Sequence, residues 1–343
     1  MKFNLSKYFK SNKPLRPLIV AEISANHCGK KSLFIKTIKS AAKNGADLIK
    51  IQTYEPGDIT INKNFKAKKF DNRKIWKLYS TAQTPYAWHK EAFDISKKLD
   101  IEIFSSPFSE RAVDFLTKFK VKLFKLSSFE INDFKLIKKI ALTKKPVIIS
   151  TGMAKLKEIK DCVQLINKYH NKIILLHCVS GYPTSEDQAN LKRILTLKKN
   201  FKKNNIGLSD HTNDINTSIA SIPYNPVIIE KHFILSEKLN SLDKNFSITP
   251  SKLRELSKKS RNIFTALGDG KFKIQKSEKK SLNFRRSIFT IKNLKKGEKF
   301  SKKNISTFRP KIGLSAKHFF KILGKKSNRK LKPFSPVFSS YLE

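Results

Sequence analysis

Two lysines lie inside short runs of the chain that are otherwise apolar. Lys50 stands in the run LIKI, and Lys125 stands in the run LFKL. A buried ammonium group is costly in free energy unless an anion neutralises it, so both lysines require partners. An anionic ligand is one interpretation. A structural ion pair with Glu22 or Glu130 is the alternative.

The two lysines belong to a larger set of polar residues at or near the ends of such runs. They are Glu22, Lys50, Gln52, Ser106, Lys125, Ser128, Glu130, Ser150, Thr151, His177, Ser180, Tyr182, Ser209, Asp210, His211, Glu230, Lys231 and His232. A single serine in such a place usually satisfies a backbone group, but the whole set favours one common site. Serine hydroxyls and backbone amides donate to oxyanions without adding charge, so they predict a cradle for phosphate and carboxylate groups.

Two histidines, His211 and His232, end the last two runs of this kind. If the runs are neighbouring strands, the two imidazoles lie side by side. Two nitrogens with nearby oxygens and no thiolate suit an open octahedral site for Mn²⁺, Mg²⁺ or Co²⁺. Hydrogen-bonded core histidines are the alternative.

The elements that must position these residues are eight short apolar runs separated by helical patterns. The runs cover residues 18–24, 47–53, 101–106, 121–126, 146–150, 172–178, 205–209 and 226–231. Their near-continuous apolar character predicts parallel strands buried on both faces. Eight strands with crossover helices predict an α/β fold, a (β/α)₈ TIM barrel whose strand ends meet at one mouth. A doubly wound sheet is the alternative, but no glycine-rich nucleotide fingerprint follows the first run.

The domain organisation follows from where this alternation stops. Residues 1–267 form the predicted barrel, residues 268–283 read as a lysine-rich linker, and residues 284–343 predict a small β-rich domain with turn-punctuated short strands. The interval of about 45 residues between the second and third runs predicts a long loop or a small extra hairpin.

The chain carries a formal net charge of +45, from 72 Lys and Arg against 27 Asp and Glu. Such a charge is typical of nucleic-acid-binding proteins, and a non-catalytic nucleic-acid-binding protein is the alternative from another class. The lysines are spread along almost the whole chain, which indicates compositional bias instead. We therefore expect no nucleic-acid partner, and a small anionic substrate would benefit from the same positive field.

The three cysteines show no CxxC spacing, which argues against a disulfide framework or a thiolate zinc site. No apolar run is long enough to cross a bilayer. We therefore expect a cytoplasmic protein that has no membrane partner.

Eight motifs, one for each run, resemble the sialic-acid (nonulosonic-acid) synthase family. They are AEISANHCG (21–29), GADLIKIQTY (45–54), FSSPFS (104–109), FKLSSFE (124–130), STGM (150–153), LHCVSGYPT (176–184), GLSDHT (207–212) and IIEKHF (228–233). The tail from about Ser287 resembles the antifreeze-like (SAF) domain at the C-terminus of these synthases. TPYAWH (84–89), ISANH and SSFE resemble the pseudaminic-acid branch of the family.

The resemblance implies a role for each matching position. Phosphoenolpyruvate would be held by Lys50, Ser106, Lys125, Ser128, Ser150, Ser180 and Ser209, where Ser106 replaces a common threonine and Ser180 an asparagine. The sugar would be held by Gln52, Tyr182, Asp243, Phe284 and Arg309. A divalent metal would be held by His211 and His232, and Glu22 and Glu130 would be the catalytic carboxylates.

The resemblance also implies the reaction. Phosphoenolpyruvate would condense with 2,4-diacetamido-2,4,6-trideoxy-L-altrose to give pseudaminic acid and phosphate, in a domain-swapped homodimer where Arg309 reaches the partner's barrel. N-acetylneuraminate or legionaminate synthesis on a different acceptor is the alternative within the family. A degenerate barrel kept as a scaffold is disfavoured, because every motif position remains chemically competent.

Overall fold

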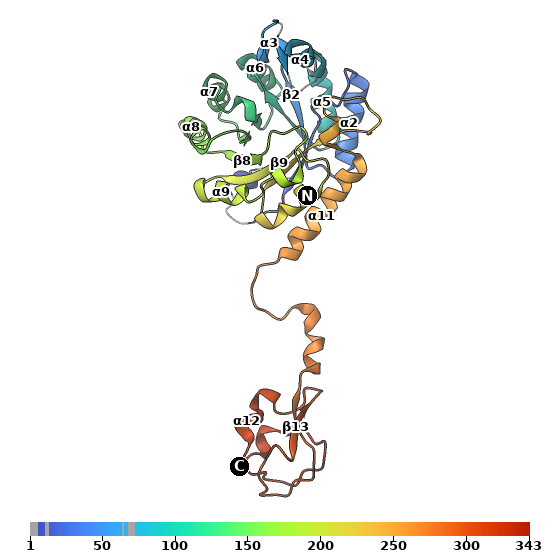
Figure 1. The fold of residues 1–343 in the computed structure, drawn as a ribbon, viewed down its shortest axis with the longest axis vertical. Helices are drawn as coiled ribbons and strands as arrows, with labels where there is room; N and C mark the ends of the chain where they lie inside the picture. The colour runs from blue at the N-terminus through green and yellow to red at the C-terminus, as the bar shows by residue number, and fades with distance from the viewer. Residues whose placement is uncertain (1–5, 11–13, 64, 68–72) are drawn as a thin grey trace. The chain divides into compact units, whose positions relative to one another are not determined.

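The computed structural model describes the whole chain apart from residues 1–5, 11–13, 64 and 68–72 (Figure 1). The chain divides into two compact units, Met1–Gly268 and Asp269–Glu343. Each unit has its own hydrophobic core. No helix among the described residues is long and apolar enough to cross a membrane.

The first unit is a closed barrel of parallel strands. In order around the barrel these are β1 (Leu18–Glu22), β2 (Leu48–Thr53), β5 (Glu102–Pro107), β6 (Phe124–Leu126), β7 (Val147–Ser150), β8 (Ile173–Cys178), β9 (Asn205–Asp210) and β10 (Ile228–Phe233). Pairing of β1 with β10, in the register Leu18 with Ile228, closes the ring. β11 (Ser247–Ile248) adds to β10. The predicted (β/α)₈ barrel is confirmed.

Helices fill the crossovers between these strands and cover the outside of the barrel (Figure 1). They are α2 (Lys31–Lys43), α5 (Tyr86–Lys98), α6 (Glu110–Lys118), α7 (Phe134–Leu142), α8 (Leu156–Asn167), α9 (Arg193–Asn200), α10 (Asn216–Ala220) and α11 (Pro250–Leu267); the short α1 (Lys7–Lys10) precedes β1. In α2, Phe34, Ile38 and Ala41 recur at helical spacing and are fully buried.

The strands place apolar and polar side chains at different heights of the barrel. Along β1, Ile19 and Ala21 belong to the core under the helices, whereas Leu18 and Val20 belong to a second core inside the barrel. Because side chains alternate along a strand, Glu22 follows Val20 on the inner face. The inner faces are therefore apolar at the base and polar at the carboxyl end of the strands.

The long interval after β2 contains both helices and a hairpin. α3 (Pro56–Ile59) and α4 (Ile75–Ala82) flank β3 (Lys66–Ala67), which pairs antiparallel with β4 (Arg73–Lys74). Of the two predicted alternatives, a long loop or a small extra hairpin, the antiparallel pairing of β3 with β4 matches the second; residues 68–72 between the two strands lie outside the described residues.

The second unit contains a two-stranded antiparallel sheet, β12 (Ser287–Thr290) with β13 (Ile305–Phe308), and α12 (Phe319–Ile322). Isolated bridges such as Leu294 with Leu331 extend this β structure. Ile288, Phe300 and Val337 form part of its small core.

The described residues of both units also include short 3₁₀ helices: η2 (Ser128–Glu130), η3 (Glu186–Gln188), η4 (Ile222–Tyr224), η5 (Lys244–Phe246), η6 (Lys276–Glu278), η7 (Lys280–Phe284), η8 (Ala316–His318) and η9 (Ser339–Tyr341).

Candidate active site

A cavity of about 610 Å³ opens at the carboxyl ends of the barrel strands. Its lining contains most of the residues singled out from the sequence, namely Lys50, Gln52, Ser106, Lys125, Ser128, Glu130, Ser150, Tyr182, Ser209, His211, Glu230, His232 and Asp243. The barrel thus gathers side chains that are far apart along the chain, from Lys50 to Asp243. This convergence follows from the inward, strand-end position of each residue.

Four charged side chains form a chain of contacts at the base of the cavity. Lys50 Nζ lies 3.1 Å from Glu22 Oε2 and 3.0 Å from Glu230 Oε1, and all three residues are buried. Lys125 Nζ lies 3.7 Å from the same Glu230 oxygen. Glu230 therefore bridges the two lysines. The ion pair between Lys50 and Glu22 matches one alternative considered from the sequence, whereas the carboxylate in contact with Lys125 is Glu230 instead of Glu130.

Serine hydroxyls surround these lysines. Lys125 Nζ donates to Ser150 Oγ at 2.7 Å, and Ser209 Oγ donates to Glu230 Oε1 at 3.0 Å. Within the part of the chain that the structure describes, Ser106 Oγ and Glu230 Oε2 are buried without a hydrogen-bond partner. A native structure leaves few such atoms unpaired, so these two indicate a place for a polar ligand.

Burial and neighbouring charges shift the pKa values of Glu22, Lys125 and Glu230. Burial raises the pKa of Glu22 to about 7, with Lys50 opposing and Glu230 reinforcing the shift. Burial also lowers the pKa of Lys125 to about 8. Burial would raise the pKa of Glu230, but Lys125 and Lys50 outweigh it and lower that pKa to about 2. Near neutral pH, Glu230 is ionised, while Glu22 can either hold or release a proton.

Glu130 and Gln52 occupy another wall of the cavity. Ser127 Oγ donates to Glu130 Oε2, and burial raises the pKa of Glu130 to about 7. Gln52 Nε2 donates to Glu22 Oε1 at 3.2 Å and to Ser24 Oγ at 2.9 Å. Glu22 is fully buried and lies next to Lys50 and Gln52, so Glu130 is the more accessible of the two predicted catalytic carboxylates.

The two histidines lie together at the mouth, with ring centroids 5.4 Å apart. His211 Nδ1 is 2.9 Å from the carbonyl oxygen of Val179. A carbonyl only accepts, so this nitrogen carries the hydrogen and leaves Nε2 as the free acceptor of a neutral ring. Burial lowers the pKa of His232 to about 4, which keeps its ring neutral, the state that binds metals.

The surroundings of the two rings allow an open metal site with two protein nitrogens. Among the described residues, no group of three or more His, Cys, Asp or Glu side chains is arranged to hold an ion. His232 Nδ1 is buried without a hydrogen-bond partner and lies 3.6 Å from Asp243 Oδ2. The pair therefore fits a metal that takes its remaining ligands from water or substrate.

Aromatic rings close this side of the cavity. Tyr182 lies 4.2 Å from the His211 ring, and Phe246 lies 4.8 Å from the His232 ring, measured between centroids. Asp243 Oδ2 accepts the backbone N–H of Ala25 at 3.1 Å. Tyr182 and Asp243 thus flank the histidines in the cavity, and their predicted role as sugar-binding residues stays a prediction.

Three predicted residues stand apart from this group. Ser180 does not line the cavity itself, but its Oγ is 3.9 Å from Cys178 Sγ, which does. Phe284 and Arg309 are exposed residues of the second unit, so the first unit by itself does not contain them.

The sequence did not predict that Glu230 bridges the two lysines, nor that Cys178 and Phe246 line the cavity. The spacing of Glu230 and His232, two apart on one strand, was the available signal that they share a face.

A parallel barrel with this mouth is the scaffold of a (β/α)₈ enzyme. The chain belongs to the NeuB family, whose model matches residues 37–272.

Similarity to known proteins extends over nearly the whole chain. It is 38% identical to the pseudaminic acid synthase of Campylobacter jejuni over 94% of this chain and 95% of that protein. It is 36% identical to the N,N'-diacetyllegionaminic acid synthase of the same species, over 92% and 97% respectively. The crystal structure of N-acetylneuraminic acid synthetase from Leptospira borgpetersenii superposes with a TM-score of 0.71 at 31% identity, covering 80% of this chain and 92% of that one.

Proposed function

We propose that the chain is a pseudaminic acid synthase, which condenses phosphoenolpyruvate with 2,4-diacetamido-2,4,6-trideoxy-L-altrose. The observation that carries the proposal is the cavity in which Lys50, Lys125 and the strand-end serines meet, in a chain that resembles such a synthase over nearly all its length. Two cations and unpaired polar atoms at the base of one cavity suit a substrate that carries both a phosphate and a carboxylate.

The lysines and serines would hold phosphoenolpyruvate. Lys50 and Lys125 face the two anionic groups, and Ser106, Ser128, Ser150, Ser180 and Ser209 donate hydrogen bonds to them. In this structure the Glu230 carboxylate contacts the ammonium groups of both lysines. A trianionic substrate competes with Glu230 for these cations, and we expect their side chains to shift toward the ligand when it binds.

The reaction joins the enol carbon of phosphoenolpyruvate to the aldehyde carbon of the open-chain sugar. Water then adds to the carbon that carried the phosphate, and cleavage of its C–O bond releases inorganic phosphate and leaves an α-keto acid. The raised pKa values of Glu22 and Glu130, each about 7, suit a group that exchanges a proton with this water near neutral pH.

We further propose that His211 and His232 hold a divalent metal, Mn²⁺, Mg²⁺ or Co²⁺. When bound there, the metal supplies a Lewis acid that polarises the sugar aldehyde. The protein's own part is to hold the two rings close together in a largely buried position and to keep the His232 ring neutral. Asp243 Oδ2 accepts the backbone N–H of Ala25 and lies 3.6 Å from His232 Nδ1, so Asp243 would help to orient the His232 ring.

The acceptor sugar would bind between Gln52, Tyr182 and Asp243. We also propose that the C-terminal unit is an antifreeze-like (SAF) domain. In the proposed homodimer, Phe284 and Arg309 of this unit complete the sugar site of the partner chain. The guanidinium group has five donors for the acetamido and hydroxyl oxygens of such a sugar. A cytoplasmic location, where the cysteines stay reduced, is the setting we propose.

The second candidate function differs only in the acceptor. Similarity to a legionaminic acid synthase at 36% identity favours testing legionaminate and N-acetylneuraminate synthesis beside pseudaminate synthesis. Phosphate release from phosphoenolpyruvate should be measured with each of the three acceptor sugars. We expect the highest kcat/KM with the altrose derivative. A higher value with either other acceptor would reassign the subtype.

A further inference from the structure

The strands that carry the two histidines are joined by a second pair of residues on their outer face. In the register of β9 with β10, Ser209 lies opposite Glu230 and Asp210 lies opposite Lys231. The first pair faces the cavity, so the second faces the surrounding helices. Lys231 is 0% exposed and Asp210 is 3% exposed, and neither lines the cavity.

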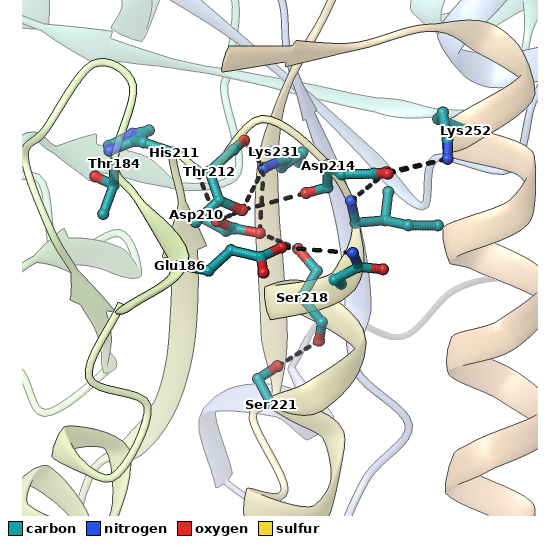
Figure 2. Close-up of polar contacts among 12 residues, drawn as sticks. Thr184, Glu186, Asp210, His211, Thr212, Asp214, Ser218, Ser221, Lys231 and Lys252 are labelled. Carbon is teal, nitrogen blue, oxygen red and sulfur yellow. Dashed lines mark hydrogen bonds and ion pairs between the residues drawn. The ribbon is translucent and has the colours of Figure 1, made fainter. Parts of the chain in front are cut away.

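Asp210 and Lys231 are bound to each other and to Thr212 (Figure 2). Lys231 Nζ lies 3.2 Å from Asp210 Oδ2 and donates to the carbonyl oxygen of Thr212. Asp210 Oδ1 accepts from the backbone N–H and the hydroxyl of Thr212, both at 2.8 Å. These contacts close a ring around the backbone of His211, which stands between Asp210 and Thr212 in the sequence.

The same network is anchored to the helices behind it. Ser218 Oγ, in α10, donates to Asp210 Oδ2 at 2.5 Å. The Thr212 hydroxyl is 3.2 Å from the carbonyl oxygen of Asp214, whose carboxylate pairs with Lys252 of α11 at 3.1 Å. The segment that follows β9 is therefore fixed to α10 and α11 as well as to β10 (Figure 2).

We propose that the buried Asp210–Lys231 pair positions His211 and His232 relative to each other. Asp210 fixes the backbone on both sides of His211, and Lys231 directly precedes His232 on the neighbouring strand. Stability alone is a weak reason for such a pair, since the cost of burying two charges often cancels their attraction, whereas fixing one register is an established use. The inference rests on the proposed metal-binding role of the two histidines.

The test compares two paired substitutions in the full-length chain. Asp210→Asn combined with Lys231→Met removes both charges together, because removing one would leave the other buried and unpaired. Arg16→Met combined with Asp47→Asn is the control: this pair, 2.6 Å apart, precedes β1 and β2 at the other end of the barrel and is less deeply buried. The measurements are the Kd for Mn²⁺, the melting temperature, and the separation of the two imidazole rings in a crystal structure.

We expect the Asp210/Lys231 variant to bind Mn²⁺ at least about tenfold more weakly than the wild type, as is usual when a residue supporting a metal ligand is lost. Its ring separation should depart from 5.4 Å. The Arg16/Asp47 variant should lose thermal stability and keep its Mn²⁺ affinity. A variant at Asp210 and Lys231 with unchanged Mn²⁺ affinity and unchanged ring separation overturns the inference.

Two further variants keep this outcome separate from failure of the metal proposal. If His211→Ala and His232→Ala leave Mn²⁺ affinity unchanged, the metal assignment is wrong, and the ring separation alone then decides the inference. If the double variant does not fold, Thr212→Val removes the hydroxyl that both charged residues contact and keeps both charges. A loss of Mn²⁺ affinity in Thr212→Val, smaller than the loss of about tenfold expected for the double variant, supports the inference, and an unchanged affinity overturns it.

Discussion

Glu230 connects the two lysines of the cavity and holds both in place before any ligand is present. It accepts from Ser209 at 3.0 Å and lies within 4 Å of Lys50 and Lys125. Such an arrangement stabilises two buried cations that would otherwise repel each other. It also leaves one carboxylate oxygen, Oε2, without a hydrogen-bond partner among the described residues.

Substitution of either lysine should weaken phosphoenolpyruvate binding far more than sugar binding. In Lys125→Met the chain loses a charge-assisted donor, worth roughly 1.5–3 kcal/mol, so we expect KM for phosphoenolpyruvate to rise about tenfold or more. Lys50→Met should do the same and also destabilise the fold, because it leaves Glu22 and Glu230 without their shared cation. Steady-state kinetics with each substrate varied in turn measures both effects.

Lys198→Met is the matched control for these variants. Lys198 is a half-buried lysine that donates to the carbonyl oxygens of Tyr224 and Asn225, away from the cavity. The Lys198→Met variant should be less stable than the wild type but should have the same KM for phosphoenolpyruvate. An unchanged KM in both Lys50→Met and Lys125→Met would return these lysines to a purely structural role.

A buried histidine outside the cavity should make stability depend on pH. His89 is fully buried, its Nε2 is 2.8 Å from Thr53 Oγ1, and burial lowers its pKa to about 4. The unfolded chain takes up this proton near pH 6.5, so the stabilisation is complete above that pH and is lost as the pH falls toward 4. From pH 7 to pH 5 the loss should be about 2 kcal/mol.

His89→Gln removes this titration and retains an amide for Thr53. Urea unfolding at pH 7 and pH 5 should therefore show a free energy of unfolding that falls less in the variant than in the wild type. Equal pH dependence in the two proteins would mean that His89 is not held neutral in the folded state.

At the scale of the elements, the strands could be predicted because their side chains alternate between two apolar environments. Leu18 and Val20 pack inside the barrel while Ile19 and Ala21 pack under the helices, so β1 is apolar throughout and ends at a charged residue. The partners of Glu230 could not be predicted in the same way. Lys50 and Lys125 come from strands more than 100 residues earlier, and only the closed barrel brings them to it.

The segment after β7 depends on a glycine that fits between two serines. A Cβ atom at Gly152 would lie 2.8 Å from Ser128 Oγ and closer still to Ser180 Oγ, so both hydroxyls would have to move. We expect Gly152→Ala to raise KM for phosphoenolpyruvate roughly tenfold and to cost about 1–3 kcal/mol of stability.

Gly57→Ala is the control for this change, because the nearest atom to its Cβ would be a Trp76 side-chain atom at 3.9 Å, an ordinary contact. Its kinetics should match the wild type. If Gly152→Ala also bound phosphoenolpyruvate normally, Ser128 and Ser180 would not be the ligand's hydrogen-bond donors.

At the scale of the whole molecule, the chain has two units that each have a core of their own. The sequence pattern predicted a second β-rich domain, but its short strands and isolated bridges give weak periodicity, so little of its internal pairing could be predicted. The proposed homodimer assigns that unit a function, because Arg309 of one chain would complete the sugar site of the other.

Subunit mixing tests this arrangement. Arg309→Ala and His211→Ala chains should each be nearly inactive alone. Mixed dimers should recover up to about half the activity of a wild-type dimer, because one of the two mouths then has both intact histidines and an intact arginine. Absence of recovery, with subunit exchange shown by differently tagged chains, would place Arg309 outside the partner's site.

The proposed reaction joins phosphoenolpyruvate to an acetamido sugar in this barrel and releases phosphate. Its most direct test is mass spectrometry of the product formed from phosphoenolpyruvate and 2,4-diacetamido-2,4,6-trideoxy-L-altrose with Mn²⁺, with phosphate assayed in the same reaction. We expect one product with the mass of pseudaminic acid, formed in a one-to-one ratio with phosphate by the wild type and much more slowly by Lys125→Met. Phosphate release without a new nine-carbon acid, or no turnover with this sugar and with both alternative acceptors, would contradict it.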